Sequence, residues 1–311
     1  MPTTPLFTLS SPISLLEKSF EIYRRHFKRL IGIILFTQLT AFIAGFSLLM
    51  LGVLVAVLAG VGNIFSSGMG ERLTALVFVG IGIFLVCLIV GFLLFLFVSA
   101  WGGVAIVLAV ATRNQPLPLG LLFKTAALRV LPYWCVMFLS GFLVLGSISL
   151  FFIPGFLFAL WFSQAMYIVI LEGTGGINAL IKSREYMRDR LIAYLVRMFV
   201  FQVIWIAIYV LIDMFPLLTR LVMGEESHIF SILSNTVSFF MTIILIPLST
   251  IYYLLLFEQL KKARGPFVLT VTASRKLKYI GIALLGYAVI LIIPIVIFIA
   301  SNNDCRYIDC F

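Results

Sequence analysis

The sequence predicts an all-α, polytopic transmembrane helical bundle of about seven spans, with amphipathic helices at its cytoplasmic interface. Of its 311 residues, 63% are hydrophobic and only 11% are charged, whereas soluble domains carry about 25% charged residues. The mean hydropathy is +1.20. Long uncharged runs also recur along the chain, and a transmembrane helix needs roughly 20 apolar residues. These observations exclude a soluble enzyme, a disordered tail, a secreted disulfide scaffold and a free nucleic-acid binder.

The uncharged runs predict the helices in order. The run from 130 to 171 is about twice the length of one span, and Pro154-Gly155 lies just past its middle, so we expect two helices joined by a tight turn. Gly102-Gly103 is expected to end the second helix of the chain. The predicted helices cover residues 30–60, 74–102, 131–152, 155–172, 191–213, 229–257 and 279–300.

The distribution of basic residues predicts the orientation. With seven spans, 19 of the 22 Lys and Arg residues fall on one side of the membrane and three on the other. Positive residues accumulate on the cytoplasmic side, so the N-terminus is expected in the cytoplasm and the C-terminal tail outside. The apolar run after residue 29 is too long for the core of a cleavable signal peptide, so we expect the first span to be retained.

Two cysteines, Cys305 and Cys310, lie in the tail that this topology places outside. An oxidising compartment would permit a disulfide between them. The alternative is two unpaired thiols.

A repeated octet predicts how the chain is organised. Pro12-Ile-Ser-Leu-Leu-Glu-Lys-Ser19 resembles the octets 118–125 and 176–183, and each precedes a pair of predicted spans. Ser14 and Glu17 are a candidate capping box for the first. The pattern predicts three units, each an interfacial helix followed by a hairpin, and then a basic loop, an extra span and an external tail. Within a single transmembrane domain, these segments are 10–112, 113–172, 173–258 and 259–311.

Basic residues beside the predicted spans are candidate contacts for anionic lipid headgroups. Clusters of Lys and Arg at this position attract anionic lipids, but the same residues also serve to set topology. The candidates are Lys18, Arg24, Arg25, Lys124, Lys182, Arg188, Lys261 and Lys262.

Catalytic and metal-binding motifs are missing from the sequence. It has two histidines and no His-Glu-x-x-His pair, Gly-x-Ser-x-Gly elbow or glycine-rich phosphate loop. We therefore expect no enzyme activity, no metal and no cofactor. Arg197, Gln202 and Asn235 are polar residues within predicted spans. A transporter would use them to line a polar cavity, whereas helix packing and snorkelling explain them without a ligand.

The stretch from Ile153 to Glu172, with the octet that follows, resembles a known family. It is similar to prokaryotic integral membrane proteins grouped with the membrane domain of glycerophosphoryl diester phosphodiesterases. The residues that carry the resemblance are Pro154, Gly155, Glu172 and Ser183, with Ala179 and Leu180 between them. The resemblance covers roughly residues 10–265 and implies the prokaryotic cytoplasmic (inner) membrane. It does not imply phosphodiesterase activity, because the soluble domain that supplies those catalytic residues has no counterpart in this chain.

These features predict a non-enzymatic membrane scaffold or lipid-interacting module. The alternative function is a small-solute or lipid transporter. Membrane lipids are the expected partners and nucleic acid is not; a protein partner or a homo-oligomer is left open.

Overall fold

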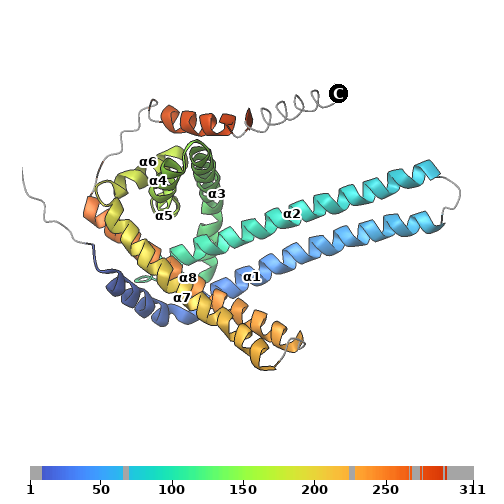
Figure 1. Cartoon of the computed structure of the whole chain (residues 1–311), viewed down its shortest axis with the longest axis horizontal. Coiled ribbons are helices and arrows are strands. Elements are labelled where there is room, and N and C mark those ends of the chain that lie inside the picture. Colours follow the sequence, from blue (N-terminus) through green and yellow to red (C-terminus); the bar gives the residue numbers. More distant parts are fainter. Residues whose placement is uncertain are drawn as a thin grey trace, which may run out of the picture. The chain divides into compact units, whose positions relative to one another are not determined.

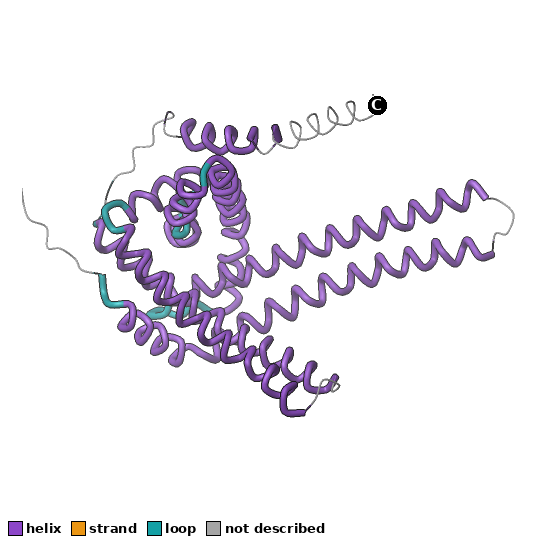
Figure 2. The backbone as a smooth tube through the Cα atoms, in the orientation of Figure 1, coloured by secondary structure: helices purple, strands orange, loops and turns teal. Residues whose placement is uncertain are grey.

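The computed structural model describes residues 9–65, 70–223, 228–265, 267, 274, 276–289 and 291–292. Within these residues every regular element is a helix (Figures 1 and 2), which confirms the all-α prediction. The helices are α1 (Pro12–Phe65), α2 (Gly70–Ala111), α3 (Leu119–Leu150), α4 (Phe152–Phe162), α5 (Ala165–Glu172), α6 (Gly176–Met187), α7 (Leu191–Met223) and α8 (His228–Arg264). Residues 276–289 are also helical, and from 279 onward they belong to the predicted seventh span, 279–300. Most of the second half of that span lies outside the described residues.

Six helical segments in the described part of the chain are long and apolar enough to cross a membrane. They are Pro12–Leu58, Phe78–Ala111, Leu119–Leu150, Phe152–Glu172, Leu191–Ile212 and Thr236–Arg264. Large apolar side chains cover their surfaces; Phe42 is 64% exposed and Phe78 is 73% exposed. A surface of this kind needs hydrocarbon around it, since water would not tolerate so much exposed apolar area. The protein is therefore a multi-pass membrane protein.

The chain forms two compact units, which are described separately. One comprises Met1–Ile22, Leu131–Thr242 and Leu248–Phe311, and the other comprises Tyr23–Val130 and Ile243–Pro247. We refer to them as the large unit and the hairpin unit.

The hairpin unit is dominated by α1 and α2, which lie side by side (Figure 1). Their backbones approach closely where glycines face each other: a Cβ on Gly91 would lie 3.5 Å from the carbonyl oxygen of Gly45. Small residues allow such contact between membrane helices, where van der Waals packing drives association.

The predicted end of the second helix at Gly102-Gly103 is wrong, because α2 continues through both glycines to Ala111. A Cβ on Gly102 would lie only 2.6 Å from Oγ1 of Thr37, whose side chain is buried. This glycine therefore allows two helices to pack closely and does not terminate one.

In the large unit, the predicted reversal near Pro154-Gly155 is confirmed, but these residues lie inside the second helix. The reversal is at Phe151, which is extended between α3 and α4. Pro154 occupies the first turn of α4, where its missing N–H leaves no hydrogen bond unmade. A Cβ on Gly155 would lie 2.2 Å from Cγ1 of Ile148, so the glycine lets α4 fold back tightly onto α3.

The span Phe152–Glu172 is interrupted at Ser163-Gln164, between α4 and α5. Tyr194 of α7 covers the interruption: its hydroxyl lies 2.7 Å from Oγ of Ser163 and accepts a hydrogen bond of 2.8 Å from Nε2 of Gln164. Polar side chains are thus supplied where the helical hydrogen bonding stops.

Each repeated octet opens a helix, at Pro12, Leu119 and Gly176. The first two helices run on directly into a span, and only the third octet forms a short helix of its own, α6. The first helix is capped by Ser11 and not by the predicted Ser14–Glu17 box: Oγ of Ser11 accepts a 3.2 Å hydrogen bond from the N–H of Ser14.

The two neighbouring glycines in α2 provide a matched test of this packing. We expect Gly102→Ala to lower the stability of the protein by about 1–3 kcal/mol, because the methyl group overlaps a stiff, buried β-branched side chain. Gly103→Ala should be neutral or slightly stabilising, since nothing lies within 4 Å of its Cβ position. The measurement is the melting temperature of each variant in detergent. Equal shifts for the two variants would contradict the packing role of Gly102.

Candidate functional site

A single carboxylate, that of Glu172, joins three helices of the large unit. Glu172 ends α5, and its side chain is 9% exposed. Nζ of Lys182 on α6 lies 2.6 Å from one of its oxygens, and Nζ of Lys261 on α8 lies 2.6 Å from the other. The hydroxyl of Tyr186 donates a further hydrogen bond of 2.9 Å. A carboxylate held this far from water requires such partners to remain charged.

The turn after Glu172 explains how α6 returns to it. Gly173 and Gly176 have positive φ angles, of 69° and 61°, which glycine adopts without steric cost. The pKa of Tyr186 on α6 is raised by burial and by its hydrogen bond to Glu172. Its hydroxyl therefore keeps its proton, and remains a donor to the carboxylate, throughout the physiological pH range.

The residues of the family pattern all have packing roles in this unit. Ser183 is fully buried, and its hydroxyl donates a 2.5 Å hydrogen bond to the carbonyl of Trp161, which ties α6 to α4. Glu172 pairs with the two lysines, while Pro154 and Gly155 form the start of α4.

The predicted lipid contacts fall into two groups. The first group forms ion pairs within the protein: Lys182 and Lys261 pair with Glu172, and Arg188 lies 3.7 Å from Glu185. The side chains of Lys18, Arg24, Arg25, Lys124 and Lys262 are exposed. Within the described residues, no carboxylate forms an ion pair with Lys18, Arg24, Lys124 or Lys262.

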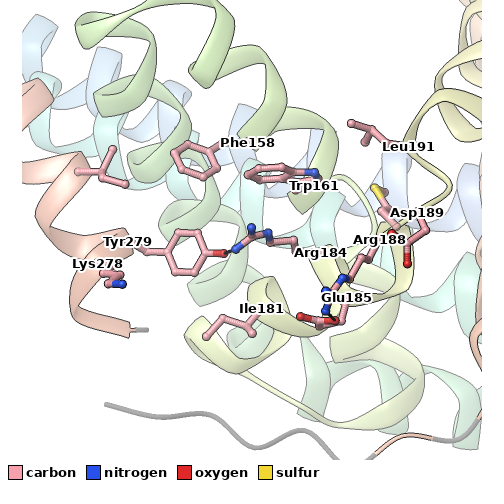
Figure 3. Close-up of a pocket in the computed structure, with 12 residues that line it drawn as sticks. Phe158, Trp161, Ile181, Arg184, Glu185, Arg188, Asp189, Leu191, Lys278 and Tyr279 are labelled. Carbon is pink, nitrogen blue, oxygen red and sulfur yellow. Dashed lines mark hydrogen bonds and ion pairs between the residues drawn. The ribbon is translucent and has the colours of Figure 1, made fainter. Parts of the chain in front are cut away.

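A cavity of about 690 Å³ lies beside α6 in the large unit (Figure 3). The guanidinium of Arg184 projects into it, with Cζ 4.5 Å from the centre of the Trp161 ring. Nη1 of the same arginine donates a 2.7 Å hydrogen bond to the hydroxyl of Tyr279. The stacking contact and the hydrogen bond hold the arginine from two sides. We call this cavity the Arg184 pocket.

The Arg184 pocket has a charged rim and an apolar wall. Further rim charges come from Glu185, Arg188 and Asp189, at the junction of α6 and α7, and from Lys278. The apolar wall includes Phe158, Ile181, Met187, Leu191 and Ile282. Of these lining residues the sequence analysis selected only Arg188. No local pattern points to the others, because the pocket assembles segments that are distant in the chain.

Arg197, predicted as a polar residue within a span, binds the backbone that precedes α1. Its Nε donates to the carbonyl of Ser10 at 2.9 Å and its Nη2 to the carbonyl of Leu9 at 2.7 Å. The Gln259 side chain completes the contact, since its Oε1 accepts the N–H of Ser10 at 3.2 Å and its Nε2 donates to the Ser10 hydroxyl. We call these contacts the N-terminal clamp.

The other predicted intramembrane residues are not part of the clamp. Gln202 is exposed, and its Nε2 donates a 3.2 Å hydrogen bond to the hydroxyl of Tyr253. The side chain of Asn235 lies outside the described residues, as do Cys305 and Cys310. The disulfide therefore stays a prediction. Among the residues that were described, no group of three or more His, Cys, Asp and Glu is arranged to hold a metal ion.

Comparison of the chain with protein-family models, curated proteins and solved structures finds no match. The resemblance to the phosphodiesterase-associated membrane family stays a prediction. What the fold defines is an all-α, multi-pass membrane protein.

The N-terminal clamp can be tested by hydrogen exchange. We expect Arg197→Gln to increase deuterium uptake in the peptide that contains Leu9 and Ser10, because two carbonyls lose their donors and the segment opens more often. Gln259→Ala should have a similar effect, whereas Lys262→Gln, one turn away and exposed, serves as the control. Unchanged uptake in the Arg197→Gln variant would show that the clamp does not hold this segment.

Proposed function

We propose that the protein is a non-enzymatic, lipid-interacting module of the prokaryotic cytoplasmic membrane, with a scaffolding role. Its exposed basic residues attract anionic lipid headgroups. The observation that supports this most directly is the set of exposed cations, Lys18, Arg24, Lys124 and Lys262, for which the described residues provide no carboxylate partner.

The positions of these cations on their helices favour a common membrane surface. Lys18 and Arg24 lie in the first four turns of α1, Lys124 in the second turn of α3, and Lys262 in the last turn of α8. If consecutive spans alternate across the bilayer, all of these positions are on the same side. A basic residue near an anionic leaflet contributes about 1 kcal/mol, so four of them produce a substantial local enrichment.

The proposed orientation places this surface in the cytoplasm, with the N-terminus on the same side and the C-terminus outside. The uneven distribution of Lys and Arg, with 19 on the proposed cytoplasmic side and three on the other, supports this orientation. The proposal that the protein is not an enzyme rests on the lack of catalytic motifs in the sequence.

Replacing these four cations should abolish the lipid preference. We expect the combined variant Lys18→Gln, Arg24→Gln, Lys124→Gln and Lys262→Gln to co-purify with about twofold less anionic lipid, relative to zwitterionic lipid, than the wild type. Quantitative lipid mass spectrometry provides the measurement. The control exchanges the same residues between Lys and Arg, which preserves every charge. A folded Gln variant with the wild-type lipid ratio would disprove the proposal.

One observation favours the transporter alternative, namely the interruption of a span at Ser163-Gln164. Transporters often bind their substrates where a membrane helix is discontinuous. If a water-filled pathway reached this point, a Ser163→Cys variant, made after the four native cysteines are changed to Ser, would react with a membrane-impermeant thiol reagent.

We expect no such labelling of Ser163→Cys, because Tyr194 closes the interruption with two polar contacts. Lys262→Cys, on an exposed position of α8, is the accessible control and should react. Labelling of both variants at similar rates would favour transport over the lipid-interacting role.

A further inference from the structure

Arg184 is held in the pocket by contacts with Tyr279 and Trp161. Its guanidinium has five N–H donors, and in the described part of the chain one of its nitrogens donates, to Tyr279. Cζ of Arg184 lies over the Trp161 ring, 4.5 Å from its centre. Such a contact fixes the direction of the charge without neutralising it. The arginine is thus held in place with most of its donors available.

The acidic residues at the rim have other partners. Oε2 of Glu185 lies 3.7 Å from Arg188 and 3.4 Å from Arg264, and Arg264 also lies 3.8 Å from Asp189. Across the residues that the structure describes, neither Arg184 nor Lys278 has a carboxylate within ion-pair distance. The pocket therefore carries a positive charge that its own acids do not compensate, and this charge favours an anionic ligand.

The wall of the pocket shows what else the ligand must contain. Phe158 lies within the span Phe152–Glu172 and Leu191 begins the span Leu191–Ile212. Ile282 lies in the helical segment 276–289. The pocket therefore extends from a charged helix junction onto apolar surfaces of membrane-crossing segments. Phe158 is buried, but Leu191 and Ile282 are partly exposed. A small water-soluble anion would leave this apolar surface uncovered, whereas the acyl part of a lipid would cover it.

We propose that the Arg184 pocket binds one anionic phospholipid. Its phosphate lies on the guanidinium of Arg184, near Lys278, and its glycerol and upper acyl chain lie along Phe158 and Ile282. Arginine suits this ligand because its planar fork can donate two parallel hydrogen bonds to one phosphate. A volume of about 690 Å³ lies within the range of roughly 300–1,000 Å³ that is usual for ligand sites. The proposal rests on the proposed lipid interaction, but it concerns a discrete site that the four exposed cations do not form.

Native mass spectrometry of delipidated protein tests the site directly. The protein is titrated with phosphatidylglycerol and, separately, with phosphatidylcholine of the same acyl composition. We expect one phosphatidylglycerol to bind with clear preference, and Arg184→Gln to weaken that binding about tenfold or more, as one charge-assisted bidentate contact is lost. Arg184→Lys should recover part of the affinity, because it restores the charge without the planar fork.

A second variant keeps the test informative if Arg184→Gln folds poorly. Tyr279→Phe removes the hydroxyl that positions the arginine but retains the ring, and we expect phosphatidylglycerol to bind several-fold more weakly. Wild-type affinity in both Tyr279→Phe and Arg184→Gln would overturn the proposal. So would equal competition by inorganic phosphate, which would identify a site for a free anion and not for a lipid.

The failure of this proposal can be separated from that of the proposed function. The four-cation Gln variant retains Arg184 and should still bind one phosphatidylglycerol, even at about 0.5 M salt, where exposed charges are largely screened. Suppose that the four-cation variant keeps its overall lipid ratio while Arg184→Gln loses the single lipid. The proposed attraction of lipids by the four cations is then wrong, and the proposed Arg184 site is supported. If the lipid ratio falls in the four-cation variant but Arg184→Gln binds phosphatidylglycerol as the wild type does, the proposed lipid site in the Arg184 pocket is wrong. The attraction of lipids by the four cations is then supported.

Discussion

Inside a bilayer a backbone N–H or C=O finds no water, and the structure follows from the need to satisfy these groups within the protein. Long unbroken helices such as α1 and α2 satisfy most of them. Where the helical pattern stops, side chains provide the partners. Near the Ser163-Gln164 interruption, the hydroxyls of Ser163 and Ser183 donate to the carbonyls of Leu160 and Trp161. Arg197 donates to two carbonyls in the segment before α1. Ser163, Gln164 and Arg197 are thus explained by the backbone groups and side chains that they bind.

Glu172 determines the role of two of the basic residues. By pairing with Lys182 and Lys261 it connects α5, α6 and α8 and gives two lysines a structural role. Together with the Ser183 hydrogen bond to Trp161, these contacts hold α6 against α4 and α5. The position of Arg184, one residue after Ser183, depends on this arrangement. The carboxylate positions the helix that carries the pocket's principal cation.

Hydropathy alone predicted the helical class and the approximate position of each described span, because apolar length is a property of contiguous residues. It did not predict which glycines end helices. Two adjacent glycines such as Gly102-Gly103 are typical of a helix end. Only the position of Thr37 in the fold shows that Gly102 is a packing residue. The pattern of charges likewise did not predict the role of Lys182. A lysine beside a span gives the same sequence pattern whether or not a carboxylate lies near it in the fold. The Arg184 pocket was beyond sequence reasoning, because Arg184 and Tyr279 are 95 residues apart.

The N-terminal clamp has a consequence for how the protein is made. Ser10 and Gln259 are separated by 249 residues, so Gln259, which binds Ser10 in addition to Arg197, is translated long after Ser10. At about 5–20 residues per second this interval is on the order of tens of seconds. During that time α1 through α7 can enter the membrane while the contact between Ser10 and Gln259 is still unmade. The N-terminal clamp is therefore completed late in biogenesis, when α8 has reached its place.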